Sequence, residues 1–204
     1  LYFFEIATLE KVEQDQVSVR FDIISADPTY AKSIDIIGNT RTKDLVIRRE
    51  LEFAEGDAIN EIILNKSRSK IFNRGIFSQV QIKKNKNDNV IIEVEEKSTG
   101  TFQFGVGYNS FDGATFIAQL NENNFQGTGR TLNLTFNNSS NRSEYKLGLV
   151  QPYIFNKDLD LIYNLNFRQI DLSTSSSYKY DTFDTEIGFN YDLLDKLSHR
   201  FTVG

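Results

Sequence analysis

Apolar and polar residues alternate strictly through the second half of the chain. From Phe102 to Tyr108, apolar side chains occupy every second position, and Gln103, Gly105 and Gly107 stand between them. Further segments repeat this pattern, and turns rich in Asn, Gly, Asp and Ser separate them. Because successive side chains of a strand point to opposite faces, period two predicts strands with one apolar face. We expect residues 98–204 to form an antiparallel meander of six strands, with a seventh beginning.

The first half has a mixed pattern that predicts an α/β module. Ser33–Ile37 is predicted to be a strand, and a helix follows it through residues 45–51. A second helix is expected from Asn60, whose side chain can cap it, to Gly75, which is a typical residue after a helix end. Two strands are predicted at residues 77–83 and 90–95. The order is β-α-α-β-β. Residues 1–26 resemble the last two strands of a preceding copy, with strands predicted at residues 2–7 and 16–24.

The composition changes at residues 97–100 and supports this division. Residues 1–97 hold 17 Asp or Glu and 8 aromatic residues. Residues 98–204 hold 11 Asp or Glu and 18 aromatic residues, so the second half has fewer acidic and more aromatic side chains. The net charge of −5 gives no basic footprint for nucleic acid. The chain has no Cys, which excludes disulfides and thiolate chemistry. It also has no Met, and its last residues read as a strand cut short, so we expect a fragment of a larger protein.

Alternation alone leaves a membrane β-barrel and a soluble β-sandwich open. The chain has no run of about 18 apolar residues, so a transmembrane helix is not expected. Four features favour the barrel. The apolar face is rich in Phe and Tyr, aromatic residues fall near strand ends, and the polar face carries few charges. The segments are also about nine to eleven residues long, which is the length of a tilted strand that crosses a bilayer.

Short motifs resemble a known family when they are taken in order. Gly38-Asn39 follows the strand that precedes the first helix, and Gly75 stands before an aromatic strand start. Gly127-Thr128-Gly129 and Pro152-Tyr153 occupy later turns. Each motif is weak alone. Together with the junction at residues 94–108, they resemble the BamA family of outer-membrane assembly factors over nearly the whole chain.

The resemblance implies the fold and the domains. Residues 1–28 would be the C-terminal part of a POTRA (polypeptide-transport-associated) module, residues 29–97 a complete POTRA module, and residues 98–204 the first six to seven strands of an outer-membrane β-barrel. The fold class is therefore α+β POTRA modules followed by antiparallel transmembrane β-barrel strands, truncated from a larger barrel. Residues 1–97 would lie in the periplasm of a Gram-negative bacterium.

The resemblance also implies a function. The protein would insert β-barrel proteins into the outer membrane, with POTRA modules receiving clients in the periplasm. Its partners would be the outer-membrane bilayer, unfolded β-barrel clients, periplasmic chaperones and accessory lipoproteins, and not nucleic acid. In lipid, unpaired backbone groups are costly, so the first strand must be covered or must template a partner strand.

Two sets of residues are predicted to have these roles, one in the seam strand and one on the lipid-facing side of the barrel. The seam strand that would template clients comprises Thr101, Phe102, Gln103, Phe104, Gly105, Val106, Gly107, Tyr108 and Asn109. The lipid-facing set comprises Phe102, Phe104, Phe116, Leu132, Leu134, Phe136, Leu147, Leu161, Tyr163, Leu165, Phe167, Ile187 and Phe189.

Catalytic, metal and cofactor sites are not expected. His199 is the one histidine, and a solvated or structural role is the ordinary one for such a residue. We find no nucleophile with a positioned base. Three alternative functions stay open: a two-partner secretion transporter, a barrel that tails a secreted hydrolase, and a soluble carbohydrate-binding β-sandwich.

Overall fold

The computed structural model describes residues 5–13, 16–25, 29–85, 87–173, 178–194 and 197–204. The chain divides into two compact units. The first comprises residues 1–40 and 44–96, and the second comprises Arg41–Lys43 and residues 97–204. Each unit is described by itself.

A β-hairpin opens the first unit. Strands β1 (Glu5–Glu13) and β2 (Gln16–Ser25) pair antiparallel, with Thr8 opposite Phe21 and Val12 opposite Val17. The first strand is predicted at residues 2–7. Its residues 2–4 lie outside the described part, and the observed strand continues to Glu13. Val17, Val19 and Phe21 are exposed on one face of the hairpin.

An α/β fold follows the hairpin and has the predicted β-α-α-β-β order. Its elements are β3 (Thr29–Tyr30), β4 (Ser33–Ile37), α1 (Asp44–Arg48), β5 (Ala58–Ile59), α2 (Glu61–Asn73), β6 (Phe77–Lys84) and β7 (Asn89–Glu96). The small sheet has the order β4-β7-β6, in which β4 is parallel to β7 and β6 is antiparallel to it. The short β3–β5 pair was not predicted, since two-residue strands leave no periodic pattern.

The core of the first unit lies between the small sheet and the helices. Ile47 and Ile71 from the helices and Phe77 and Val90 from the sheet are almost wholly buried. The side chain of Asn60 caps α2, as predicted, by accepting a hydrogen bond of 2.9 Å from Ile63 N–H. α1 ends at Arg48, three residues before the predicted end. This core gives the unit a dry interior of its own.

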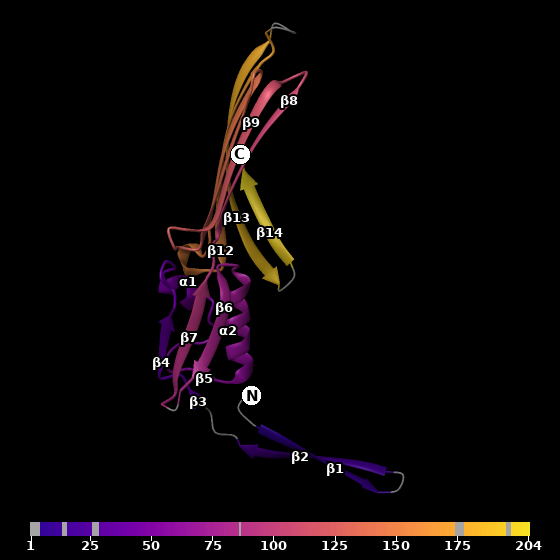
Figure 1. The fold of residues 1–204 in the computed structure, drawn as a ribbon. Helices are drawn as coiled ribbons and strands as arrows, with labels where there is room; N and C mark the ends of the chain where they lie inside the picture. The colour runs from indigo at the N-terminus through magenta and orange to yellow at the C-terminus, as the bar shows by residue number, and fades with distance from the viewer. Residues whose placement is uncertain (1–4, 14–15, 26–28, 86, 174–177, 195–196) are drawn as a thin grey trace. The chain divides into compact units, whose positions relative to one another are not determined.

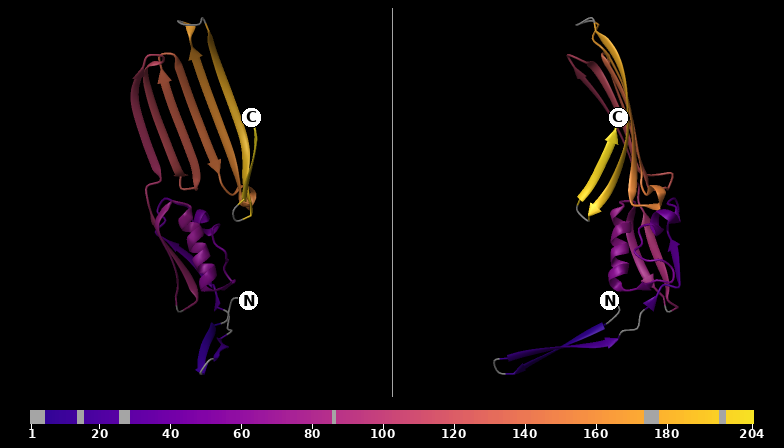
Figure 2. Two further views of the ribbon diagram at one scale, coloured as in Figure 1. Left: turned by 90° about the vertical axis from the view of Figure 1, so that its right-hand side faces the viewer. Right: turned by 180° about the vertical axis from the view of Figure 1, so that it is seen from behind.

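The second unit contains the large sheet, which Figures 1 and 2 show as strands side by side in chain order. Its strands are β8 (Gly100–Asn109), β9 (Gly113–Phe125), β10 (Arg130–Ser139), β11 (Arg142–Gln151), β12 (Leu159–Asp171), β13 (Lys179–Leu194) and β14 (Leu197–Val203). Within the described residues every neighbouring pair is antiparallel, so the predicted meander is confirmed. The strands run further into the turns than expected, and only Ser140 and Asn141 separate β10 from β11.

The strand register sorts side chains onto two faces. Leu134 pairs with Leu120 and Leu147, and Leu165 pairs with Leu147, so these residues share what we call the apolar face. The neighbouring positions Gln119, Thr135, Lys146 and Asn166 share the opposite, polar face. The registers of the large sheet place every residue of the predicted lipid-facing set on the apolar face.

Candidate membrane-facing sheet and seam strand

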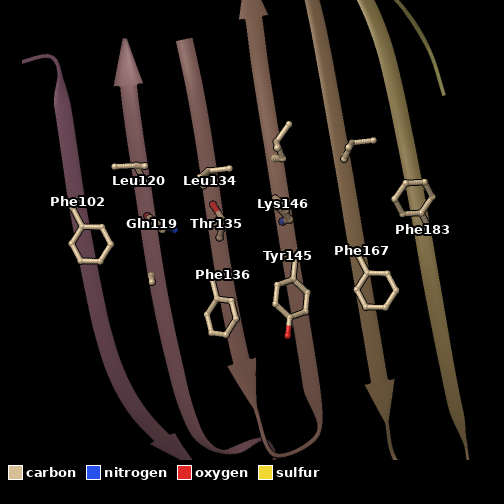
Figure 3. A pocket seen from close by; sticks show the side chains of 13 residues that line it. Phe102, Gln119, Leu120, Leu134, Thr135, Phe136, Tyr145, Lys146, Phe167 and Phe183 are labelled. Atoms are coloured by element: carbon tan, nitrogen blue, oxygen red, sulfur yellow. The ribbon is translucent and has the colours of Figure 1, made fainter. Parts of the chain in front are cut away.

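A row of aromatic side chains crosses the apolar face, as Figure 3 shows. The register aligns Phe136, Tyr145, Phe167 and Phe183 on successive strands. The ring centroids of Phe136 and Tyr145 lie 5.1 Å apart, and those of Tyr145 and Phe167 lie 6.0 Å apart. These are ordinary distances for tilted or edge-to-face aromatic pairs. The row therefore stabilises the sheet across strands without a second layer.

The apolar face is exposed. Phe102 and Phe104 are 68% and 69% exposed, although both are large apolar residues. Leu120, Leu134 and the aromatic row line a hollow on this face of about 540 Å³. Among the described residues of the second unit, no second sheet packs on this face. A soluble sandwich would bury this face, so the geometry argues against that alternative.

The apolar band has a height that suits a bilayer. On β13 the apolar face carries Phe183, Ile187 and Phe189, with Tyr191 at the end. The eight steps from Phe183 to Tyr191 span about 27 Å along a strand. With the usual tilt of roughly 40° this is about 21 Å along the membrane normal, close to the apolar band of roughly 25 Å in outer-membrane barrels.

The polar face gathers charged and amide side chains that pair across strands. Arg168 Nη2 lies 2.9 Å from Glu144 Oε1, and Lys146 Nζ lies 3.2 Å from the same oxygen. Asn164 Nδ2 donates to Glu186 Oε2 at 2.9 Å. Each of these charged or amide groups thus has a polar partner on a neighbouring strand. The arrangement suits a water-filled lumen on this face.

Strand β8 lies at an end of the large sheet and pairs with β9 from Gly100 to Asn109. All ten residues of β8 are exposed. The strands that precede it among the described residues belong to other sheets, so none of them covers its free edge. The predicted seam residues, Thr101 to Asn109, all lie in this strand. The edge thus presents unpaired backbone groups in register.

Both ends of β8 are tied to neighbouring backbone. Asn123 N–H donates to Thr99 C=O at 3.3 Å just before the strand begins. Asn109 Oδ1 accepts hydrogen bonds from the backbone N–H groups of Phe111 and Asp112, at 2.9 and 2.6 Å. Among the described strands, β8 therefore pairs with β9 alone.

Each residue of the first group of predicted turn motifs has a clear local cause. Gly38 has φ +92°, and an added Cβ would lie 1.9 Å from Val94 O. The Asn39 side chain donates to Asp44 Oδ1 at 2.7 Å, at the start of α1. Gly75 has φ +72° and donates its N–H to Phe72 C=O, which ends α2.

The turn between β9 and β10 is built around Asn124, whose hydrogen bonds the sequence patterns did not predict. Asn124 is 8% exposed; its Nδ2 donates to Thr42 Oγ1 at 2.8 Å, and its Oδ1 accepts from Gly129 N–H at 2.9 Å. Gly127 has φ +69°, and its Cβ would lie 2.0 Å from Arg41 O in the same unit. Thr128 Oγ1 donates to Phe125 C=O at 2.6 Å.

The later turn motif is conformationally strained. Pro152 is buried, and Tyr153 has φ +56°. Phe155, inside the 3₁₀ turn Ile154–Asn156, has φ +55° and is 83% exposed. Positive φ is uncommon for bulky residues.

The remaining features concern His199, metal binding and membrane-spanning helices in the described residues. His199 lies in β14 with its ring 5.5 Å from that of Tyr191. The described residues contain no cluster of His, Asp or Glu that could hold a metal ion. None of the described helices is long and apolar enough to cross a bilayer.

Comparison with known proteins identifies both units. Residues 29–97 match the POTRA model, described as surface antigen variable number repeat, and residues 124–204 match the Omp85 superfamily domain. The outer membrane protein assembly factor BamA of Neorickettsia risticii is 31% identical over 186 residues, which is 89% of this chain. That of Buchnera aphidicola is 26% identical over 198 residues, or 91% of the chain.

The chain is a BamA-like protein. Its α/β fold is a POTRA module, and its large sheet is part of an Omp85 barrel. It is accordingly an outer-membrane protein whose POTRA part lies in the periplasm. The chain spans 25% and 32% of the length of the two relatives named above.

Solved structures agree with the BamA-like fold. BamA from Haemophilus ducreyi lacking POTRA domains 1–3 superposes with a TM-score of 0.75 at 23% identity, over 98% of this chain and 40% of that one. CdiB from Acinetobacter baumannii gives a TM-score of 0.57 at 15% identity, over 98% of this chain and 42% of that one. At these identities the likeness concerns the fold alone.

Proposed function

We propose that this BamA-like chain takes part in the assembly and insertion of β-barrel proteins into the outer membrane. The observation that carries the proposal is the free edge of β8, which stands at the end of the sheet with all its residues exposed. Such an edge in lipid must be paired, and an incoming strand can pair with it by β-augmentation. Phe102, Leu134 and the other apolar-face residues then contact hydrocarbon, and the polar face lines the lumen.

The POTRA part is proposed to receive clients before they reach β8. In the small sheet, β4 and β6 are the end strands, so each has an edge that an extended peptide can join. Unfolded β-barrel proteins, periplasmic chaperones and accessory lipoproteins are the partners we propose. We also propose that residues 1–28 close a preceding POTRA module, that residues 29–97 form a complete one, and that the barrel begins at residue 98.

The assembly function is favoured over a two-partner secretion transporter. The relatives that match by sequence are named as outer membrane protein assembly factors, from Neorickettsia, Buchnera and Neisseria. Both functions share the fold, so the fold does not separate them. A seam that templates strands is needed only for assembly.

Cysteine crosslinking in the full-length protein tests the proposal. The chain has no native Cys, so a single cysteine introduced into it reports one position once any Cys elsewhere in the full-length protein is replaced by Ser. Gln103→Cys lies on β8, and Thr135→Cys lies on the same row of the polar face two strands away. We expect Gln103→Cys to form disulfides with cysteines in an arrested client strand and Thr135→Cys to form few. Crosslinks that favour Thr135→Cys would contradict the seam role.

A further inference from the structure

Arg130 is a charged residue on the apolar face of the large sheet. It is the first residue of β10, and it shares a face with Leu132 and Leu134 because side chains alternate along a strand. Gln151, the last residue of β11, pairs with Leu161 and therefore lies on the same face. An arginine and an amide thus stand at the ends of two neighbouring strands, next to their apolar residues.

The guanidinium of Arg130 is oriented by the protein on one side. Its Nε donates to Gln151 Oε1, and Gln151 Nε2 donates to Pro152 C=O at 2.9 Å, which holds the amide in place. Within the described residues, neither Nη group of Arg130 donates a hydrogen bond, and no carboxylate forms an ion pair with it. On the polar face, by contrast, Arg168 Nη2 donates to Glu144 Oε1 at 2.9 Å. Arg130 therefore has donors left for an anionic ligand.

Glu122 is the acidic residue on the same face of β9, opposite Leu132, and it does not neutralise Arg130. Its Oε1 accepts hydrogen bonds from Thr99 Oγ1 and from Asn124 N–H, the latter at 2.7 Å. A Cβ added at Gly100, its partner on β8, would lie 2.8 Å from Glu122 Oε2. The carboxylate thus lies on the β8 side of β9, whereas Arg130 lies on β10.

The strand order places Arg130 at the periplasmic side of the membrane. The POTRA match ends at residue 97 and β8 begins at Gly100, so β8 starts on the periplasmic side. Because neighbouring strands are antiparallel, β10 also starts there and β11 ends there. The turn that follows Gln151 carries Phe155, which is 83% exposed. Exposed aromatic rings and long basic side chains are typical of the headgroup level of a bilayer.

We propose that Arg130 binds the phosphate of a glycerophospholipid in the periplasmic leaflet, an inference that rests on the proposed lipid contact of the apolar face. Gln151 orients the guanidinium through the bond to its Nε. The Nη groups form a planar fork that matches phosphate oxygens and gives charge-assisted hydrogen bonds. The acyl chains of the bound lipid lie along Leu132 and Leu134. A cation on a lipid-facing surface is tolerated near the interface, which agrees with the position of Arg130 at the end of its strand.

Native mass spectrometry of the full-length protein in dodecyl maltoside, a detergent without phosphate, tests the site. The probes are phosphatidylglycerol and a diacylglycerol with the same acyl chains. We expect Arg130→Gln to weaken binding of the first phosphatidylglycerol about five- to tenfold, because charge-assisted hydrogen bonds are lost. Its diacylglycerol binding should not change. Arg130→Lys keeps the charge without the fork and should lose about two- to threefold. The matched control, Arg142→Gln, removes the same charge at the outer end of β11 and should bind like the parent.

The remaining outcomes would overturn the site. Equal weakening by Arg130→Gln and Arg142→Gln would show a general effect of charge. Equal weakening of phosphatidylglycerol and diacylglycerol binding by Arg130→Gln would show a damaged lipid face, and displacement of the lipid by millimolar inorganic phosphate would show a site for free anions. If Arg130→Gln loses the heat-modifiable gel migration of a folded barrel, unchanged lipid binding by Arg130→Lys is the contradicting result.

The proposed function is tested separately. Failure of both lipids to bind the parent would overturn the lipid contact of the apolar face together with the Arg130 site. Client crosslinks to Gln103→Cys do not involve Arg130, so they report on assembly whichever lipid result is found.

Discussion

The POTRA core and the apolar face of the large sheet use the same residue types in opposite surroundings. Phe77, in β6, is 1% exposed, whereas Phe104, in β8, is 69% exposed. Helix residues such as Ile71 complete the core around Phe77. No described layer of the second unit covers Phe104. Alternation therefore predicts a strand and its apolar side. Whether that side packs on protein or contacts lipid depends on whether another layer of the protein covers it.

The largest expected effect is the loss of a core side chain from the POTRA module. Phe77→Ala should destabilise this module by about 3–5 kcal/mol, since it removes a large side chain and leaves a cavity. Phe104→Ala should change the stability of the POTRA module by less than about 0.5 kcal/mol, because it removes no core contact there. Pulse proteolysis of the full-length protein in urea measures both. Similar losses of POTRA-module stability in the two variants would show that Phe77 and Phe104 do not differ in their surroundings.

A charge on either face of β10 tests the second unit in the same way. Leu134→Arg places a cation on the apolar face, and in a bilayer it should cost roughly 2–4 kcal/mol. Thr135→Arg places the same charge on the polar face and should cost much less, because water can reach it there. Urea titrations of folding into lipid vesicles give both values. Equal costs would show that the two faces meet the same solvent.

Two glycines of the POTRA module separate steric clash from backbone strain. Gly38 and Gly56 both have φ +92°, but an added Cβ meets Val94 O at Gly38 and nothing within 4 Å at Gly56. Gly56→Ala should cost about 1–2 kcal/mol, the penalty of left-handed backbone. Gly38→Ala adds a clash that should cost about 1–3 kcal/mol more. Urea unfolding measures the difference, and equal costs would contradict the approach of the Val94 carbonyl.

The smallest expected effect is a pH dependence at the POTRA surface. A hydrogen bond from Lys70, whose Nζ lies 2.5 Å from Glu52 Oε1, holds the pKa of Glu52 below its usual range. Because the folded pKa is lowered, the stabilisation is present above the pKa of the unfolded carboxyl and is lost as the pH falls through the folded value. Glu52→Gln should therefore slightly flatten the acid side of the stability profile. An unchanged profile would show that the pair contributes nothing.

Much of this architecture could be predicted from the sequence, and particular residues show why the rest could not. Period two and turn residues gave the meander, and Asn60 and Gly75 marked the ends of α2 because their local chemistry is sufficient. The hydrogen bond of Asn124 to Thr42 was not predicted, because the two residues are 82 positions apart in the sequence.

The accessibility of spin labels along β10 to oxygen and to a nickel complex shows directly whether the apolar face contacts hydrocarbon in a bilayer. A spin label is placed at each position from 131 to 137 of the full-length protein, and its collisions with oxygen and with a water-soluble nickel complex are measured. If the apolar face contacts hydrocarbon, oxygen accessibility peaks at positions 132, 134 and 136, and nickel accessibility peaks at positions 133 and 135. Nickel access at 134 and 136, or accessibility without a period of two, would contradict it.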